Sequence, residues 1–339
     1  MKAVVWTDIN KVEMKDVPLP EPKENEAIIK VGCTSICGSD LTIISGKHPR
    51  AQKPLVLGHE FMGTIFSFDK ESLKGFSIGQ RVVVEPLLSC KVCKQCKNGN
   101  EHVCKNLKLI GVETDGGFAE YVRAPIDKIY AIPDSVTDEE AALIEPLAVA
   151  VHAVNYAKLE KDDTVAIIGA GPIGLLIAQV VRAYGFSKIW IGEVSQFRLS
   201  LAQNLGFKVI DTKRYDLLDR ILTFTNGEGV NVTFDAAGVP FSCSNMIPMT
   251  SIKGRIVMTA IHKKPCEIMF QQLSYREQVI IGTRIYAKGN FQEAISLVED
   301  KKVDLKKIIT HIFSIENAIK AFRIAKNPSE SCKVVIKQI

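Results

Sequence analysis

Four cysteines lie close enough in the sequence to bind one metal ion. They are Cys90, Cys93, Cys96 and Cys104, and two, two and seven residues separate successive members. Four thiolates form a tetrahedral zinc site that leaves no ligand position open, so the metal stabilises a loop. A redox Cys-x-x-Cys pair and unrelated thiols are the alternatives, and the spacings typical of ferredoxin iron–sulfur clusters are absent. We therefore predict a structural zinc site.

A second group of residues could hold a reactive metal. Cys37 precedes Gly38, and His59 and Glu60 are adjacent. A cysteine, a histidine and a carboxylate are the mixed ligands of catalytic zinc, which keeps one position for water or substrate. Glu145 is a further candidate ligand. Taken singly, a cysteine is often a buried hydrophobic residue and a histidine a core residue, so the spacing leaves both interpretations open.

A glycine-rich turn follows an apolar run at Thr164–Ile168. The turn reads Gly169, Ala170, Gly171, Pro172, Ile173 and Gly174. In a strand–turn–helix unit, the first two glycines permit a tight turn and close approach of a pyrophosphate, and the third lets helix and strand pack closely. The free N–H groups of the following helix then face the phosphates. This pattern predicts a dinucleotide-binding site.

Glu193 ends the next predicted strand, twenty-four positions after Gly169. Its carboxylate can accept both ribose hydroxyls and would repel a 2′-phosphate, which favours NAD over NADP. Arg198 lies near enough in the sequence to weaken this preference. The alternative for Glu193 is a solvated carboxylate in a loop.

The elements that position these residues change in kind along the chain. Up to about residue 135, short β-rich runs alternate with Gly and Pro turns, which indicates a β-barrel-like unit. The predicted strands are Ala27–Val31, Gly63–Phe68 and Arg81–Val84. The lysine-rich segment Cys90–Cys104 has no apolar periodicity and is expected to form a surface lobe.

A helix is expected to begin at Glu145, because proline at the next position is tolerated in a first helical turn. From Asp163 strands and helices alternate, which predicts a parallel sheet covered on both faces. The strands are Thr164–Ile168, Lys188–Ile191, Val230–Phe234, Arg255–Thr259 and Gln278–Gly282, and a last one is Lys333–Lys337. The helices are Pro172–Tyr184, Ser195–Gly206, Phe291–Glu299 and Glu316–Ala325.

Composition narrows the class of protein. The 339 residues suffice for about two domains, and 46% hydrophobic residues exclude a disordered chain. A net charge of +5 without a lysine cluster predicts no nucleic-acid partner. Thr164–Val181 carries no charge but contains three glycines and a proline, so we expect no membrane segment. Nine cysteines without a signal peptide predict a cytoplasmic protein, and the odd count argues against a complete disulfide framework.

Taken together, these motifs identify the chain as similar to the zinc-dependent medium-chain dehydrogenases. The matching segments are Ile36–Asp40, Gly58–Glu60, Cys90–Cys104, Asp115–Tyr121, Glu145–Val149, Gly169–Gly174 and Asp235–Gly238. Within that family the chain resembles the sorbitol, threonine and galactitol-phosphate dehydrogenase branch. It is most similar to the L-galactonate/L-idonate 5-dehydrogenases and the starvation-sensing-type proteins.

The resemblance implies an α/β protein with a GroES-like β-rich catalytic domain and a Rossmann domain with a doubly wound parallel sheet. We expect the catalytic domain at 1–150, with the zinc lobe at 90–104, the NAD-binding domain at 151–286, and a segment returning to the catalytic domain at 287–339. The two separate ligand sets predict two zinc ions per chain, and the resemblance implies a homodimer or homotetramer. No membrane partner is expected.

The resemblance further assigns roles to single residues. Cys37, His59 and Glu60 match the ligands of the catalytic zinc, and Glu145 matches a position that binds the zinc or holds its water. Ser39 matches the hydroxyl that takes the proton of the alcohol. Many relatives carry a histidine where this chain has Thr42. The route of the proton beyond Ser39 therefore stays open, with His48 as one alternative.

The predicted activity is the oxidation of a secondary hydroxyl of a polyol or sugar acid by NAD, with L-galactonate, L-gulonate or L-idonate as model substrates. Arg284 could hold a substrate carboxylate through its planar guanidinium, or could form a surface salt bridge. Sorbitol-, galactitol-phosphate- or threonine-type activity is the alternative. An NAD-binding regulatory protein and a zinc-free quinone-reductase-like enzyme are further alternatives, which the complete Cys37, Ser39, His59 and Glu60 set disfavours.

Overall fold

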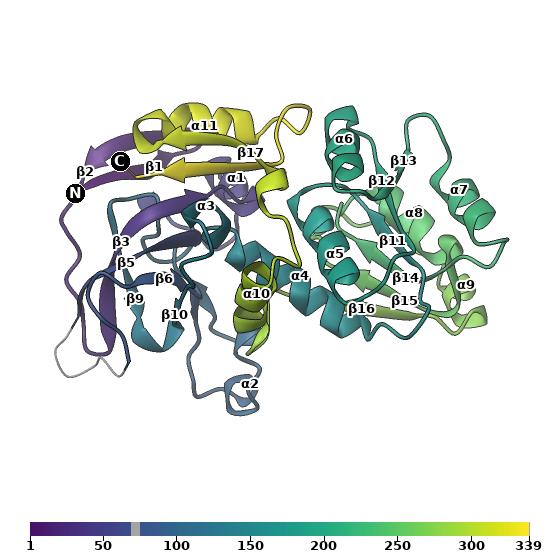
Figure 1. The fold of residues 1–339 in the computed structure, drawn as a ribbon, viewed down its shortest axis with the longest axis horizontal. Coiled ribbons are helices and arrows are strands. Elements are labelled where there is room, and N and C mark those ends of the chain that lie inside the picture. The colour runs from purple at the N-terminus through teal and green to yellow at the C-terminus, as the bar shows by residue number, and fades with distance from the viewer. Residues whose placement is uncertain (69–74, 339) are drawn as a thin grey trace.

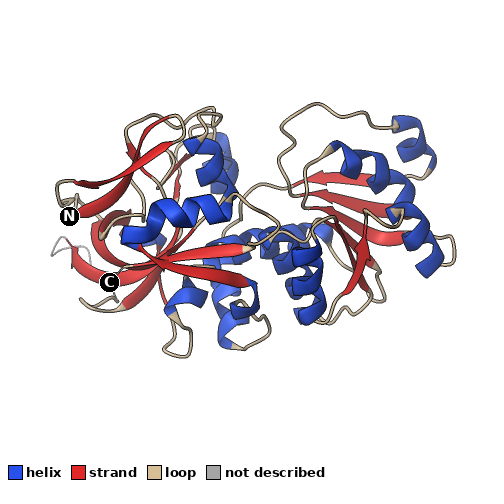
Figure 2. Ribbon diagram, turned by 90° about the horizontal axis from the view of Figure 1, so that it is seen from above, coloured by secondary structure: helices blue, strands red, loops and turns tan. Residues whose placement is uncertain are grey.

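A computed structural model describes residues 1–68 and 75–338, and it shows two lobes side by side (Figure 1). Both chain ends lie in the lobe at the left of Figure 1, and the middle of the sequence forms the other lobe. Figure 2 shows the strands of each lobe gathered into separate sheets with helices packed around them.

The first lobe is built on a seven-stranded sheet. Its strands follow the order β10-β6-β5-β3-β18-β17, and β9 also pairs with β3. They are β3 (Glu26–Ser35), β5 (Glu60–Phe68), β6 (Arg81–Val84), β9 (Tyr121–Pro125), β10 (Ile129–Ala131), β17 (Ile309–Ser314) and β18 (Lys333–Lys337). The lobe also contains two small sheets. One consists of β1 (Lys2–Asp8), β2 (Lys11–Asp16) and β4 (Leu55–Val56), and the other consists of β7 (Leu87–Leu88) and β8 (Lys108–Leu109). The α-helices of this lobe are α1 (Gly38–Ile44), α2 (Lys94–Lys97), α3 (Asp138–Ala141) and α11 (Ala318–Ala325).

The chain end returns to this first sheet. Strand β18 runs antiparallel to β3, with Val335 opposite Ser35, and parallel to β17. The sequence predicted β18 with the observed bounds, but it did not predict β17 or α1. As a consequence, residues near position 333 lie beside the segment that carries Cys37.

The second lobe contains a six-stranded parallel sheet in the order β13-β12-β11-β14-β15-β16. Its strands are β11 (Val165–Ile168), β12 (Ile189–Glu193), β13 (Lys208–Asp211), β14 (Val230–Asp235), β15 (Thr250–Met258) and β16 (Val279–Gly282). The helices are α4 (Ile144–Ala157), α5 (Pro172–Ala183), α6 (Gln196–Asn204), α7 (Leu217–Phe224), α8 (Pro240–Met249), α9 (Phe270–Tyr275) and α10 (Asn290–Glu299).

Both faces of the parallel sheet are buried. In β11, Val165 and Ile167 belong to one hydrophobic core, whereas Ala166 and Ile168 belong to another. Because successive side chains of a strand point to opposite faces, this alternation shows helices packed on each side. The predicted α/β fold with a doubly wound parallel sheet is confirmed. The predicted domain limits stay a proposal, and residue 150 lies inside the continuous helix α4.

Thr164–Val181, the uncharged stretch, is divided between β11 and α5. Within residues 1–68 and 75–338, each helix is too short or too polar to cross a bilayer.

Seven of the nine cysteines are free, and Cys243 forms a disulfide with Cys266. The sequence analysis did not predict this disulfide.

Candidate active site

Cys37 immediately precedes α1 and is the second residue after β3. The carboxylate of Asp40, in the first turn, is fully buried and accepts a hydrogen bond from the Cys37 backbone N–H at 2.9 Å through Oδ2. An acidic side chain in this position satisfies a free N–H group of the helix end. Asp40 therefore fixes the backbone that presents the Cys37 thiol.

His59 precedes β5 and faces the start of α1. Its Nδ1 lies 3.6 Å from Asp40 Oδ1, and its Nε2 lies 3.2 Å from the Ser39 hydroxyl oxygen. In the described part of the chain, neither Nδ1 nor Asp40 Oδ1 has a hydrogen-bond partner. Burial acts to lower the pKa of His59, but the Asp40 carboxylate and the Cys37 thiol outweigh it and raise this pKa well above its usual value.

The ligand atoms of Cys37, His59 and Glu60 all lie within 4.8 Å of one another. A sulfur, a ring nitrogen and a carboxylate oxygen form the donor set expected for a zinc ion with an open position. A carboxylate behind the histidine, as Asp40 is here, commonly orients such a ligand. The three residues predicted to bind a catalytic metal are thus brought together, and their chemistry fits zinc.

Glu60 has a partner that the sequence analysis missed. The Lys333 ammonium and the Ser35 hydroxyl both donate to Glu60 Oε2, and Lys333 also donates to the Ile36 carbonyl at 3.1 Å. Lys333, at the start of β18, is 2% exposed. Burial acts to lower its pKa, but the charges of Glu60 and Cys37 outweigh this and raise it. Lys333 therefore supplies positive charge to the buried acidic group.

Glu145, in the first turn of α4, lies outside the group of three ligands but close enough to interact with it. Burial and the negative charge of Glu60 raise the pKa of Glu145 to about 7, although His59 opposes the shift. The buried Tyr286 is its neighbour from the segment after β16. Burial and the Glu145 charge raise the pKa of Tyr286 well above its usual value, and its hydroxyl has no hydrogen-bond partner within the described ranges.

The four-cysteine lobe has the dimensions of a metal site. Sulfur–sulfur distances are 3.5 Å for Cys93–Cys96 and Cys90–Cys104, 3.9 Å for Cys93–Cys104 and 4.0 Å for Cys90–Cys96. A tetrahedron with zinc–sulfur bonds of about 2.3 Å has edges of about 3.8 Å. Backbone N–H groups of Cys96 and Lys105 lower the pKa of Cys93 to about 6, which favours the thiolate. These residues fit a closed zinc site.

The glycine turn joins β11 to α5 as predicted. Gly169 has a φ of +100°, which favours glycine, and Gly171 precedes the first helical residue, Pro172. A Cβ atom on Gly174 would lie 1.9 Å from the Gly169 carbonyl oxygen, so only glycine fits there. The N-terminal end of α5, with Ile173 in its first turn, is thereby held against the end of the strand, where its N–H groups are free to bind phosphate.

Glu193 is 8% exposed, so it is not a solvated loop carboxylate. Its Oε2 accepts a hydrogen bond from Ala170 N at 2.8 Å, and its Oε1 accepts from Val194 N at 2.7 Å and Ser195 N at 2.8 Å. Both lone pairs of Oε1 are thus in use, whereas Oε2 keeps one lone-pair site that can accept a hydrogen bond from a ligand. The side chain of Arg198 approaches Gly171, with its Nη1 3.5 Å from the Cβ position of that glycine.

Arg284 follows β16 and is exposed to solvent. Together with burial, its charge lowers the pKa of His102, which lies in the zinc lobe. Among the described residues no ion pair or hydrogen bond joins Arg284 to Cys37, His59 or Glu60. The structure thus places Arg284 beside the lobe and does not bring it to the metal ligands.

His48 is engaged by the backbone, since its Nδ1 accepts hydrogen bonds from Arg50 N at 3.3 Å and Ala51 N at 3.1 Å. Thr42 Oγ1 donates to the Gly38 carbonyl at 3.0 Å. Neither contact forms a chain from Ser39 to solvent. The proton route beyond Ser39 stays a prediction.

Three residues of the site were missed by sequence reasoning: Asp40, Lys333 and Tyr286. Asp40 lies three positions from Cys37, a spacing that permits a helix cap, so a first-turn helix signal could have found it. Lys333 begins an apolar strand, where a buried charge requires a partner. Tyr286 carried no such signal.

Comparison with known proteins shows which family this chain resembles. Residues 23–134 match the model of the alcohol dehydrogenase GroES-like domain, and residues 172–300 match that of the zinc-binding dehydrogenases. Sorbitol dehydrogenase of Halalkalibacterium halodurans is 33% identical over the full length of both chains. The 2-dehydro-3-deoxy-L-galactonate 5-dehydrogenase of Pseudoalteromonas atlantica is 32% identical, covering 93% of this chain and 92% of its own. The crystal structure of the alcohol dehydrogenase RspB from Escherichia coli CFT073, complexed with NADH, matches with a TM-score of 0.93 and 30% identity over 99% of each chain.

Proposed function

Because the chain belongs to the zinc-dependent medium-chain alcohol dehydrogenase family, we propose that it catalyses the reversible oxidation of a secondary hydroxyl of a polyol or sugar acid by NAD. The observation that carries this proposal is the convergence of Cys37, His59 and Glu60 beside the Ser39 hydroxyl. An NAD-binding regulatory protein would have no need of this reactive set.

Each residue has a defined task in this proposal. Cys37, His59 and Glu60 hold the zinc ion, and Glu145 lies outside this group of converging ligand atoms. Bound zinc acts as a Lewis acid that lowers the pKa of the substrate alcohol. The Ser39 hydroxyl accepts the proton that the alcohol loses, and Asp40 keeps the ring of His59 in place.

For the cofactor, we assign the pyrophosphate to the N-terminal end of α5 and the adenosine ribose to Glu193 and Arg198. NAD held by these residues would supply the hydride acceptor, and the protein would orient it. The buried carboxylate of Glu193 offers one unused lone pair, on Oε2, at the end of β12, beside the glycine turn. Negative charge at this point favours NAD over NADP.

For the substrate, we propose a sugar acid whose carboxylate is held by Arg284. This arginine is exposed, so its guanidinium is available to a ligand. A neutral polyol offers no partner of this kind. The 2-dehydro-3-deoxy-L-galactonate 5-dehydrogenase among the relatives acts on a sugar acid, which supports the same substrate class. The sorbitol dehydrogenase among them supports the neutral alternative.

The test is a spectrophotometric screen of NADH formation with aldonates, neutral polyols, sugar-alcohol phosphates and threonine. Activity with aldonates, absent in His59→Ala of unchanged circular dichroism, supports the proposal. Absence of turnover with every class would favour the regulatory alternative. Retained activity in His59→Ala would contradict the assigned metal site.

Arg284→Lys tests the carboxylate clamp separately. Lysine keeps the charge but loses the planar pair of hydrogen bonds. We expect KM for the aldonate to rise by about tenfold, with little change for neutral polyols. Lys288→Arg, an exchange at an exposed position four residues on, is the control. Unchanged aldonate kinetics in Arg284→Lys, or wild-type activity with neutral polyols alone, would contradict this clamp.

A further inference from the structure

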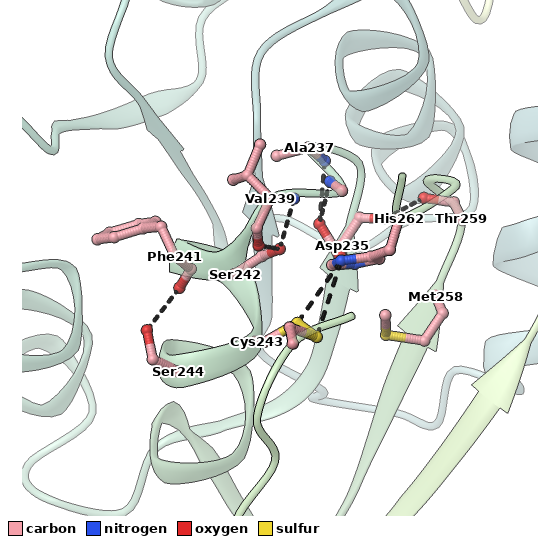
Figure 3. Close-up of polar contacts among 12 residues, drawn as sticks. Asp235, Ala237, Val239, Phe241, Ser242, Cys243, Ser244, Met258, Thr259 and His262 are labelled. Atoms are coloured by element: carbon pink, nitrogen blue, oxygen red, sulfur yellow. Dashed lines mark hydrogen bonds and ion pairs between the residues drawn. A yellow bond between two sulfur atoms is a disulfide. The ribbon is translucent and has the colours of Figure 1, made fainter. Parts of the chain in front are cut away.

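A third cluster of metal-binding side chains lies at the carboxyl ends of β14 and β15. Cys243, on α8, and Cys266, after β15, are joined by a disulfide, and His262 lies against both. His262 Nδ1 is 3.6 Å from the sulfur of Cys243 and 3.9 Å from that of Cys266 (Figure 3). The three ligand atoms are within 4.8 Å of one another. The proposed dehydrogenase reaction makes no use of them.

The opposite ring nitrogen of His262 is also fixed. His262 Nε2 lies 2.6 Å from Oδ2 of Asp235, whose side chain is fully buried. The other oxygen, Oδ1, accepts hydrogen bonds from Ala237 N and Gly238 N, each at 3.0 Å. When Nε2–H donates to the carboxylate, the lone pair of Nδ1 faces the two sulfurs. A carboxylate behind a histidine is the arrangement that orients metal ligands, and a disulfide alone has no need of it.

We propose that reduction of the Cys243–Cys266 disulfide creates a metal site, in which both thiolates and His262 Nδ1 bind a zinc-like divalent cation. Two sulfurs and one imidazole suit zinc and leave a fourth position for water. Two thiolates neutralise the charge of the ion, and the Asp235 carboxylate stabilises the ligated imidazole. The three ligand atoms of this site form a group distinct from that of Cys37, His59 and Glu60 and from that of the four cysteines.

The chemistry of this site balances with a thiol as the reductant. Two molecules of a low-molecular-weight thiol donate two electrons and two protons to the disulfide, which yields two protein thiols and one small-molecule disulfide. Binding of the cation then releases the two thiol protons, while His262 binds in its neutral form. Oxidation by a small-molecule disulfide reverses the first step and expels the cation.

The position of the cluster suggests a consequence for the remainder of the molecule. The turn after Asp235 packs on the glycine motif, since a Cβ on Gly169 would lie 3.2 Å from that of Ala237. The loop that carries His262 also reaches the first lobe, because Lys263 Nζ lies 3.4 Å from Thr42 Oγ1 on α1. A cation in the cluster would therefore stiffen a loop that spans the two lobes.

The experiment is a measurement of zinc content in the full-length protein, before and after reduction with a phosphine, followed by incubation with zinc and removal of free metal without air. We expect one more zinc ion per chain in the reduced protein than in the oxidised protein. Cys266→Ser should remove this difference, whereas Cys332→Ala, at a free cysteine outside the cluster, should keep it. Zinc bound at Cys37 or in the four-cysteine lobe is present in both redox states and cancels in the difference.

His262→Gln provides a second variant that keeps both cysteines and their disulfide. We expect its affinity for the additional zinc to fall by at least about a hundredfold, with an unchanged thermal midpoint in the oxidised state. Titration of the reduced wild type with zinc in weak buffer should release two protons per additional ion. Equal zinc content in both redox states of the wild type would overturn the proposal and leave a structural disulfide. Retention of the additional zinc in Cys266→Ser would overturn it as well.

Discussion

The single carboxylate of Asp40 positions two of the three predicted zinc ligands, Cys37 and His59. Its Oδ2 accepts from the Cys37 backbone, and its Oδ1 faces Nδ1 of His59. Asp40→Asn keeps the shape and one acceptor oxygen but removes the charge. We expect the affinity for the catalytic zinc to fall by about 10–100-fold. The measurement is competition with a chelator, with the exposed Asp8→Asn as control. Equal zinc retention in Asp40→Asn and wild type would exclude this role.

Glu193 carries the prediction on cofactor choice. We expect wild type to prefer NAD clearly over NADP in kcat/KM, and Glu193→Gln to reduce the preference by about 2–3 kcal/mol, since it removes a charge repulsion and charge-assisted hydrogen bonds. Glutamine also places an N–H₂ group among the N–H donors of Ala170, Val194 and Ser195, so some loss of thermal stability should accompany the change. Comparable kcat/KM values for the two cofactors in wild type would contradict the assignment.

At the scale of single residues, the sequence predicted those site residues whose type itself indicates chemistry. Cys37, His59 and Glu60 are metal ligands by nature, and the fold brings them together. Lys333 and Tyr286 could not be found in this way. Each becomes part of the site only because the chain returns from the second lobe, and a lysine or a tyrosine has many uses elsewhere. The sequence also did not show that Glu193 holds the glycine turn, because those contacts are to backbone N–H groups.

Among the elements, the four-cysteine lobe depends most on its predicted metal. Helix α2 has four residues and none of them is buried, so the lobe has no apolar core of its own to hold it. Cys93→Ser removes one ligand of a closed site. We expect loss of one zinc ion per chain, a lower thermal midpoint and faster aggregation. The neighbouring Val92→Ser, at a position that is 71% exposed, should leave zinc content unchanged. Unchanged zinc content in Cys93→Ser would refute the structural site.

Element prediction succeeded where hydrophobic periodicity is strong and failed where it is weak. The strand Arg81–Val84 and the helix from Pro172 were predicted at or near their observed bounds, because apolar runs with clear Gly and Pro limits define them. Helix α1 is only seven residues long and contains β-branched residues, so its sequence lacks a helical pattern. Strand β17 has half-exposed positions throughout much of its length and could not be separated from a loop.

At the scale of the whole molecule, the two lobes meet along α4, which packs against α5 of the second lobe and against α10, and also contacts β5 of the first lobe (Figure 1). His152, on α4, lies at this junction. Its Nδ1 is 3.1 Å from Asn290 Oδ1 on α10, and its ring is 5.1 Å from that of His102, in the zinc lobe. Three parts of the chain that are distant in sequence thus meet through two histidines, which explains why no local pattern revealed the contact.

This junction predicts how stability depends on pH. Burial, together with the neighbouring His102, lowers the pKa of His152 to about 4, and burial with the charge of Arg284 lowers that of His102. In an unfolded chain a histidine titrates near pH 6.5, so between pH 6.5 and 4 the unfolded state binds more protons than the folded state. The two histidines therefore make their full contribution to the free energy of unfolding above pH 6.5. This contribution decreases as the pH falls towards 4.

We expect His152 to account for about 1–3 kcal/mol of the loss between pH 7 and pH 4, a range that allows for solvent screening. The measurement compares urea unfolding of wild type and His152→Gln at several pH values. Glutamine can still donate to Asn290 but does not titrate, so its curve should be flatter over this window. Acid also protonates the thiolates of both proteins, and the difference between the two curves cancels that contribution. His311→Gln, at a half-exposed histidine away from the junction, should follow wild type. Parallel curves for wild type and His152→Gln would show that protonation of this residue does not weaken the contact between the lobes.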